Sequence, residues 1–123
     1  MYDYAAKLEQ VTDGDTVRLT VDHGMHIRSS QAIRLLDVYA PESRDVGGFE
    51  TRSFVAAWVF DHRHPRADGR PGPEWPLHVV TIKDATTFNR YIGTVTCSFC
   101  GQSLNADINV YVAAAGWGHG IGG

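Results

Sequence analysis

The most regular hydrophobic pattern in the chain lies in residues 15–22, DTVRLTVD, where apolar and polar side chains alternate. Val17, Leu19 and Val21 fall on one face of this stretch, and polar residues fall on the other. Alternation with β-branched residues is typical of a half-buried strand. Less regular apolar stretches predict four further strands, at residues 4–10, about 26–38, 77–83 and 91–99.

Two stretches have helical spacing instead. Residues 49–62 carry four apolar side chains spaced i, i+1, i+4 and i+5, which are Phe54, Val55, Trp58 and Val59. This spacing, with alanines between, predicts an amphipathic helix. A second helix is predicted between Ser103, a suitable N-cap, and Gly116, a suitable C-terminal stop.

The order of elements is strand, strand, strand, helix, strand, strand, helix, with no internal repeat. This order predicts an α+β, mainly β domain over residues 1–123, with a flexible tail at about 117–123. Several antiparallel strands interrupted by one helix favour a five-stranded Greek-key barrel of the OB-fold type with two helices.

Residues 64–76 contain four of the five prolines and therefore predict a loop. Arginines and histidines cluster in and beside it, at Arg63, Arg66, Arg70, His62 and His64. Two interpretations stay open, a solvated surface or an edge that follows a phosphate backbone.

Composition narrows the class of protein. The chain is 43% hydrophobic with a formal charge of −3, so it is globular and a poor match for a general nucleic-acid coating protein. One small phosphate site remains compatible with that net charge, because binding at such a site depends on the local charge.

No apolar run reaches the roughly 18 residues of a membrane span. Residues 1–10 show no signal peptide, so we expect a cytoplasmic protein, or a phage-encoded one acting in a bacterial host.

The two cysteines, Cys97 and Cys100, form a C-x-x-C motif. Such a motif can hold half of a zinc site or a redox disulfide, and it can also be a plain turn. A four-ligand zinc site needs two more ligands. Downstream the only candidate is His119, with no partner near it in the sequence. His62 and His64 are further candidates, but nothing in the sequence indicates that they approach the cysteines.

Polar residues interrupt the hydrophobic pattern at the ends of predicted strands: Asp13, Asp15, Thr16, Arg34, Glu42 and Arg90. Carboxylates suit a hard divalent cation, and a carboxylate can also orient or deprotonate an attacking water. Arginine is well suited to clamping a phosphate, because its planar fork of donors stays charged. Together these groups could catalyse phosphodiester hydrolysis.

Five segments in this order resemble the staphylococcal nuclease, or thermonuclease-like, family. They are DGDT (13–16), RLLDVYAPE (34–42), FETRSFVAAWV (49–59), FNRYIGTV (88–95) and SLNADINVYVAAAGW (103–117). The resemblance covers nearly the whole chain. It implies an OB-fold barrel with calcium-dependent endonuclease activity on DNA and RNA.

The resemblance also implies a role for each matching residue at the metal. Asp15 would be the first metal carboxylate, and Ala40 would offer its backbone carbonyl. Asp13 and Thr16 would lie next to these ligands. The expected cofactor is Ca²⁺, with another divalent cation as the alternative.

The remaining roles concern the phosphate. By the resemblance, Arg34 and Arg90 match the phosphate-binding arginines. Glu42 matches the glutamate that positions or activates the attacking water.

One position departs from the family pattern. Tyr39 stands where the family usually has the aspartate that supplies the second metal carboxylate, and a neutral phenol is a poor calcium ligand. Asp37 would share a strand face with Tyr39 and is the alternative carboxylate, although it lies about 6–7 Å back along a strand. Tyr39 could stack on a base, or it could pack at the mouth of the barrel.

Two functions therefore stay open. The first is a metal-dependent endonuclease acting on DNA, RNA or both, favoured by the joint presence of Asp15, Arg34, Glu42 and Arg90. The alternative is a catalytically impaired OB module that binds nucleic acid or a protein partner, favoured by Tyr39 and the negative net charge. The sequence indicates no oligomeric state.

Overall fold

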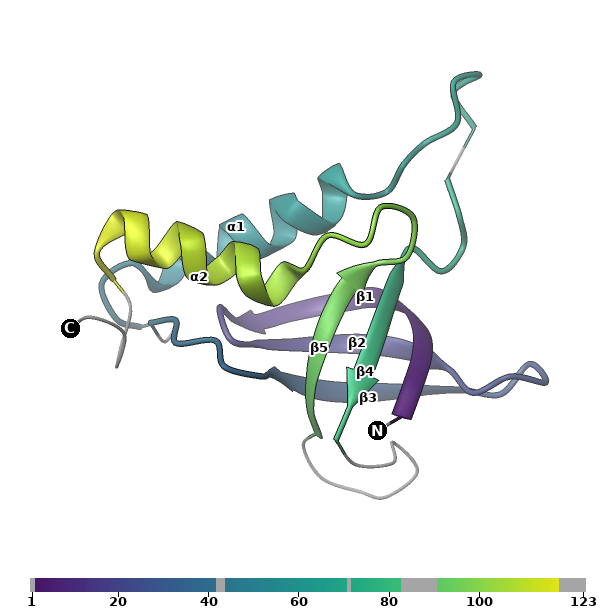
Figure 1. The fold of residues 1–123 in the computed structure, drawn as a ribbon, viewed down its shortest axis with the longest axis horizontal. Coiled ribbons are helices and arrows are strands. Elements are labelled where there is room, and N and C mark those ends of the chain that lie inside the picture. The colour runs from purple at the N-terminus through teal and green to yellow at the C-terminus, as the bar shows by residue number, and fades with distance from the viewer. Residues whose placement is uncertain (1, 42–43, 71, 83–90, 118–123) are drawn as a thin grey trace.

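The protein is described by a computed structural model that covers residues 2–41, 44–70, 72–82 and 91–117. Its elements are β1 (Tyr2–Asp13), β2 (Thr16–Asp22), β3 (Arg28–Leu35), α1 (Gly48–Asp61), β4 (Leu77–Thr81), β5 (Tyr91–Cys97) and α2 (Leu104–Ala115). The strands close into a barrel in the order β1-β2-β3-β5-β4 (Figure 1). Strands β3 and β5 pair in parallel, and the other neighbours are antiparallel. The predicted OB-like α+β fold is confirmed.

Strand β1 is longer than the predicted 4–10, because it pairs with two neighbours. Its first half runs beside β4, and from Ala5 onward it runs beside β2. The β1–β2 register shifts between Leu8 and Gln10 and again between Val11 and Asp13. Such bulges bend a strand and increase its twist, which lets β1 serve both neighbours and close the barrel.

Strand β3 ends at Leu35, so the prediction that it continues to residue 38 is wrong. The chain turns at Asp37, which has a left-handed backbone with φ of 56°. The carbonyl of Leu36 accepts a hydrogen bond from Asn105 Nδ2 of α2, at 3.0 Å, in place of a strand partner. The apolar run that begins at Ile33 is therefore divided. It is part of the barrel as far as Leu35, and the residues that follow are hydrogen-bonded to α2.

The two helices lie next to one another on the same side of the barrel (Figure 1). The predicted apolar face of α1 is confirmed. Val55 and Trp58 are buried, and Phe54 and Val59 are partly buried and pack against the core. Trp58 Nε1 donates to Asp107 Oδ2 of α2 at 2.7 Å, which joins the helices. Neither helix has the length and apolar content needed to cross a bilayer.

Both ends of α2 are as predicted. The Ser103 hydroxyl accepts from the Ala106 backbone N–H at 3.2 Å, and Gly116 has a left-handed φ of 79°. Of the flexible tail predicted at about 117–123, Trp117 alone lies among the described residues. The N–H of Trp117 donates to the carbonyl of Val112, and its ring packs against the barrel core beside Gly47. Residues 118–123 lie outside the described part of the chain.

Candidate phosphate and cation site

A hollow at one end of the barrel gathers four of the residues singled out in the sequence. It is lined by Asp15, Arg34, Val38, Tyr39, Ala40, Arg44 and Asp45, and we call it the Asp15 hollow. Its walls come from the β1–β2 turn, the end of β3 and the segment that leads to α1. Glu42 and Arg90 lie outside the described residues.

Asp15 is held through both its backbone and its side chain. It sits in the two-residue turn between β1 and β2, where Asp13 and Thr16 face each other across the strands. The Thr16 hydroxyl, which is buried, donates to Asp15 Oδ1 at 3.1 Å. The backbone N–H of Leu35 donates to the Asp15 carbonyl at 2.8 Å. The side-chain carboxylate of Asp15 is therefore positioned by β2, and the backbone carbonyl of Asp15 is positioned by the end of β3.

Gly14 brings this turn close to the rest of the site. A Cβ at Gly14 would lie 2.6 Å from Thr51 Cγ2, closer than real Cβ contacts allow, and 3.0 Å from Ala40 Cβ, tighter than most of them. Thr51 is buried in α1, and its hydroxyl donates to the Gly47 carbonyl at 2.7 Å, so it is itself fixed. The absence of a side chain at Gly14 thus lets the Asp15 turn, α1 and Ala40 meet.

Arg34 projects from the wall of the barrel. Its neighbours Ile33 and Leu35 are buried, so the alternation of a strand turns Arg34 outward, where it is exposed. Its backbone lies opposite Thr16 of β2 and Ile92 of β5. Within the ranges that the structure covers, Arg34 has no ion-pair partner. Its guanidinium is therefore available to an anionic ligand.

Two asparagines of α2 hold the segment that follows β3. Asn105, which is buried, donates from Nδ2 to the carbonyls of Leu36 and Gly93, at 3.0 and 3.1 Å. Asn109, one turn later, donates to the Asp37 carbonyl at 2.7 Å. These positioning residues were missed from the sequence. The available signal was a pair of asparagines one turn apart in a helix, where asparagine is unfavourable unless its amide has a partner.

Tyr39 lies at the edge of the hollow with 44% of its surface exposed. Stacking on a base and packing at the mouth of the barrel therefore both stay predictions for Tyr39. The strand-face argument for Asp37 is wrong, because residues 36–39 are not a strand. Asp37 is exposed and does not line the hollow. Ala40 is buried, as a close neighbour of Gly14 requires.

Sequence reasoning missed two residues that line the hollow, Arg44 and Asp45. They lie between Pro41 and the start of α1, in a stretch for which the hydrophobic pattern predicts neither a helix nor a strand. Their position beside a proposed site was the one available signal. The described wall thus carries two arginines and two aspartates, an arrangement suited to a cation and a phosphate held together.

The donor set of the hollow can be compared with what calcium requires. All its candidate ligands are oxygens, namely the carboxylates of Asp15 and Asp45 and the carbonyl of Ala40, and oxygen donors fit a hard cation. Nowhere in the described ranges do three carboxylates bring their oxygens close together. The residues present therefore fit a divalent cation of modest affinity.

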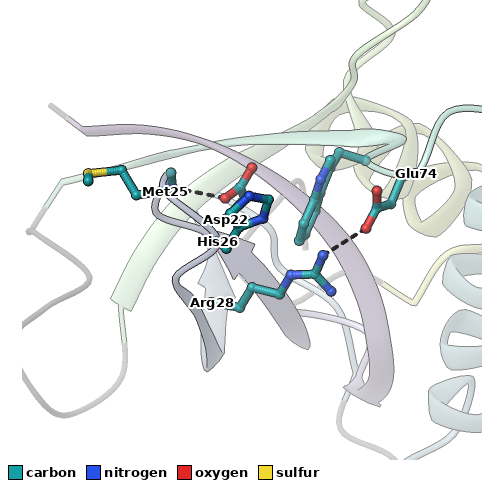
Figure 2. Close-up of a pocket in the computed structure, with 7 residues that line it drawn as sticks. Asp22, Met25, His26, Arg28 and Glu74 are labelled. Carbon is teal, nitrogen blue, oxygen red and sulfur yellow. Dashed lines mark hydrogen bonds and ion pairs between the residues drawn. The ribbon is translucent and has the colours of Figure 1, made fainter.

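A second hollow lies at the other end of β2 and β3 (Figure 2). Its lining includes Arg28, whose Nη2 forms an ion pair with Glu74 Oε1 at 2.9 Å. The same guanidinium lies 5.0 Å from the ring centre of Trp75, and Lys7 Nζ lies 5.2 Å from it. Because its arginine is already paired, this hollow is the weaker candidate for binding a phosphate.

Comparison with known proteins adds no assignment. No protein-family model matches the chain, and no curated protein matches it either. The functional argument therefore depends on the geometry of the Asp15 hollow and on the sequence motifs.

Proposed function

We propose that the chain is a divalent-metal-dependent endonuclease that hydrolyses phosphodiester bonds of DNA, RNA or both, similar to the staphylococcal nuclease family. The observation that supports this most is the meeting of Asp15, Arg34 and Ala40 in one hollow, with no ion-pair partner for Arg34 among the described residues. Asp15 comes from the DGDT segment, whereas Arg34 and Ala40 come from the RLLDVYAPE segment. Asp15 and Arg34 were selected for this chemistry from the sequence, and Ala40 from the family resemblance.

In this proposal, Arg34 binds the non-bridging oxygens of the scissile phosphate and stabilises the charge that develops there. Tyr39, exposed at the rim, stacks on a neighbouring base. Glu42 accepts a proton from the attacking water, and Arg90 supplies a second guanidinium. The last two roles come from the resemblance alone.

Calcium is the proposed metal, with Asp15 and the Ala40 carbonyl as its ligands. When bound, it would neutralise phosphate charge and favour deprotonation of water. Asp45 lines the hollow and could supply the carboxylate that Tyr39 does not. We expect weak calcium binding by the free protein and tighter binding when a phosphate completes the ligand set.

The test is cleavage of supercoiled plasmid and of single-stranded DNA and RNA oligonucleotides with Ca²⁺, Mg²⁺, Mn²⁺ or EDTA. The proposal expects metal-dependent cleavage that is lost in Glu42→Gln and Arg34→Ala. Arg28→Ala is the matched control, because it removes the same charge from the other end of the same strand. Cleavage that persists in EDTA, or that survives Glu42→Gln, would contradict the assignment.

A second function has one specific observation in its favour. The neutral Tyr39 occupies the position of an expected metal carboxylate, which suits an OB module that binds without cleaving. Such a module would shift nucleic acid in a gel, or retain a protein partner, and would show no cleavage with any metal. The cleavage assay therefore separates the two functions directly.

A further inference from the structure

The C-x-x-C motif forms a tight turn at the end of β5. Cys97 is the last residue of the strand and is buried, whereas Cys100 is exposed. The backbone N–H of Cys100 donates to Cys97 Sγ at 3.4 Å. Gly101 closes the turn with a left-handed φ of 78°, and its N–H donates to the Cys97 carbonyl at 2.8 Å. The amide of Cys100 thus points at the sulfur atom of Cys97, an arrangement that stabilises a thiolate.

A histidine from a distant part of the chain completes a cluster. His64 is the first residue of the proline-rich loop, and its Nε2 lies 3.1 Å from Cys97 Sγ. Its ring stacks on Phe99, with ring centres 4.4 Å apart. His64 also has a left-handed φ of 48°, which is costly for a residue with a side chain. Strain of this kind is often found where a side chain is held for function.

We propose that Cys97, Cys100 and His64 bind a zinc ion, with water in the fourth position. Their three ligand atoms lie within 4.8 Å of one another, and no other such group of histidine, cysteine or acidic residues occurs in the covered ranges. Ligands of a tetrahedral zinc with these donors stand about 3.5–3.8 Å apart, given Zn–S of about 2.3 Å and Zn–N of about 2.0–2.1 Å. Small side-chain shifts therefore suffice. Thiolate and imidazole donors favour zinc over calcium.

His62 is excluded as the fourth ligand. Its Nδ1 lies 2.7 Å from the Trp58 carbonyl, and its Nε2 lies 3.2 Å from Gln102 Oε1. Both ring nitrogens are therefore engaged, although the ring centre is only 5.9 Å from that of His64. The fourth position is left to solvent, on the side where Cys100 is exposed.

Zinc here would fasten the long loop between α1 and β4 to the end of β5. The cluster is separate from the Asp15 hollow, because Cys97 lies five residues along β5 from Ile92, the partner of Arg34. Five residues of strand span about 16 Å. The inference is therefore independent of the proposed nuclease activity.

The experiment measures metal directly. The full chain is purified under reducing conditions without chelator, its zinc content is determined, and the zinc is then replaced by Co²⁺. We expect one zinc per chain and a cobalt spectrum with thiolate charge-transfer bands and the visible bands of a tetrahedral ion. The charge-transfer bands report only a thiolate-bound metal, so a cation held by the oxygen ligands of the Asp15 hollow does not contribute to them.

Variants test each ligand. Cys100→Ser, at an exposed position, and His64→Ala should lose the stoichiometric zinc and the tetrahedral cobalt spectrum, while circular dichroism confirms that they fold. His62→Gln is the matched control and should keep both. The proposal is overturned if the reduced wild type binds no zinc, if the cobalt spectrum is unchanged in His64→Ala, or if His62→Gln abolishes it in a folded protein.

Discussion

The two ends of β3 each carry an arginine, and their surroundings differ. Arg28 pairs with Glu74 at 2.9 Å and lies over the ring of Trp75 (Figure 2). Arg34, six residues later, faces the Asp15 hollow and has no ion pair among the described residues. The same residue type on the same strand is thus structural at one end and available at the other.

This difference shows which feature of a charged residue indicates function. An exposed ion pair contributes little to stability, about 0–1 kcal/mol, but it occupies the guanidinium. Arg34 makes no such ion pair with any residue in the described ranges, and it lies beside Asp15, whose carboxylate is fixed by Thr16. We propose ligand binding as its role, and four predictions test this proposal.

The largest effect is expected on cleavage. Arg34→Ala should lower the rate of plasmid nicking by about 100- to 1,000-fold. Losing one hydrogen-bond donor to the charge that develops in the transition state typically slows a reaction by that factor. Arg28→Ala should change the rate by less than about twofold, since an exposed pair is worth little. Initial rates under saturating metal measure both. Equal losses in the two variants would mean that general positive charge, and not the site, drives activity.

The two ends also differ in their turn glycines, and this gives the second prediction. Gly14→Ala should lower the free energy of unfolding by about 1–3 kcal/mol, because the new methyl group overpacks against Thr51 and Ala40. Gly24→Ala has open space around it but a φ of 82°, and it should cost about 1 kcal/mol from backbone strain. Urea unfolding measures both values. Only Gly14→Ala should also reduce cleavage, because it displaces Asp15.

A double variant sharpens this test. Thr51→Ser removes the Cγ2 atom that the alanine would meet, while it keeps the hydroxyl that donates to the Gly47 carbonyl. Gly14→Ala with Thr51→Ser should therefore recover part of the stability and of the activity lost in Gly14→Ala. If the second substitution adds to the first without recovery, the close approach of Gly14 to α1 is not the cause of the loss.

Much of the barrel could be predicted from the sequence, because its signals are local. The alternation of β2, the apolar face of α1 and the caps Ser103 and Gly116 depend on neighbouring residues only. The end of β3 could not be predicted, since it depends on Asn105 and Asn109, about 70 residues away. The bulges of β1 depend likewise on pairing with two different strands.

The candidate site divides in the same way. Asp15 and Arg34 stood out because they are polar residues at the ends of predicted strands, whereas Ala40 was named only through the family resemblance. Arg44 and Asp45 lie in a loop, and the sequence of a loop does not indicate which part of the fold its side chains will contact. The approach of His64 to Cys97 was also hidden, because a contact across 33 residues leaves no periodic signal in the sequence.

Tyr39 provides the third prediction, on the metal. Tyr39→Asp should increase calcium affinity by about tenfold, because it adds an anionic ligand at the edge of the Asp15 hollow. The measurement is the calcium concentration that gives half-maximal cleavage. Tyr39→Asn is the control of equal size without charge, and it should bind calcium no better than the wild type. An unchanged calcium dependence in Tyr39→Asp would place the metal away from this residue.

The smallest effect concerns the barrel wall between the two ends, where Glu9 accepts hydrogen bonds from Thr20 at 2.6 Å and Ser30 at 2.8 Å. These bonds lower the pKa of Glu9 below its ordinary value of 4.5. A group whose pKa is lower in the folded state stabilises the fold above the unfolded pKa, and this stabilisation is lost as the pH falls through the folded value. Because Glu9 is exposed, the contribution should be under about 1 kcal/mol.

Glu9→Gln tests this contribution, because it keeps the shape of the side chain and removes its titration. The variant should be slightly less stable than the wild type at pH 7, and the difference should shrink as the pH is lowered below 4.5. Urea unfolding at several pH values measures it, with cleavage at pH 7 expected to stay unchanged. A difference that grows on acidification would mean that the hydrogen bonds favour the protonated acid. A loss of cleavage would mean that the wall, and not only the end that carries Arg34, controls the site.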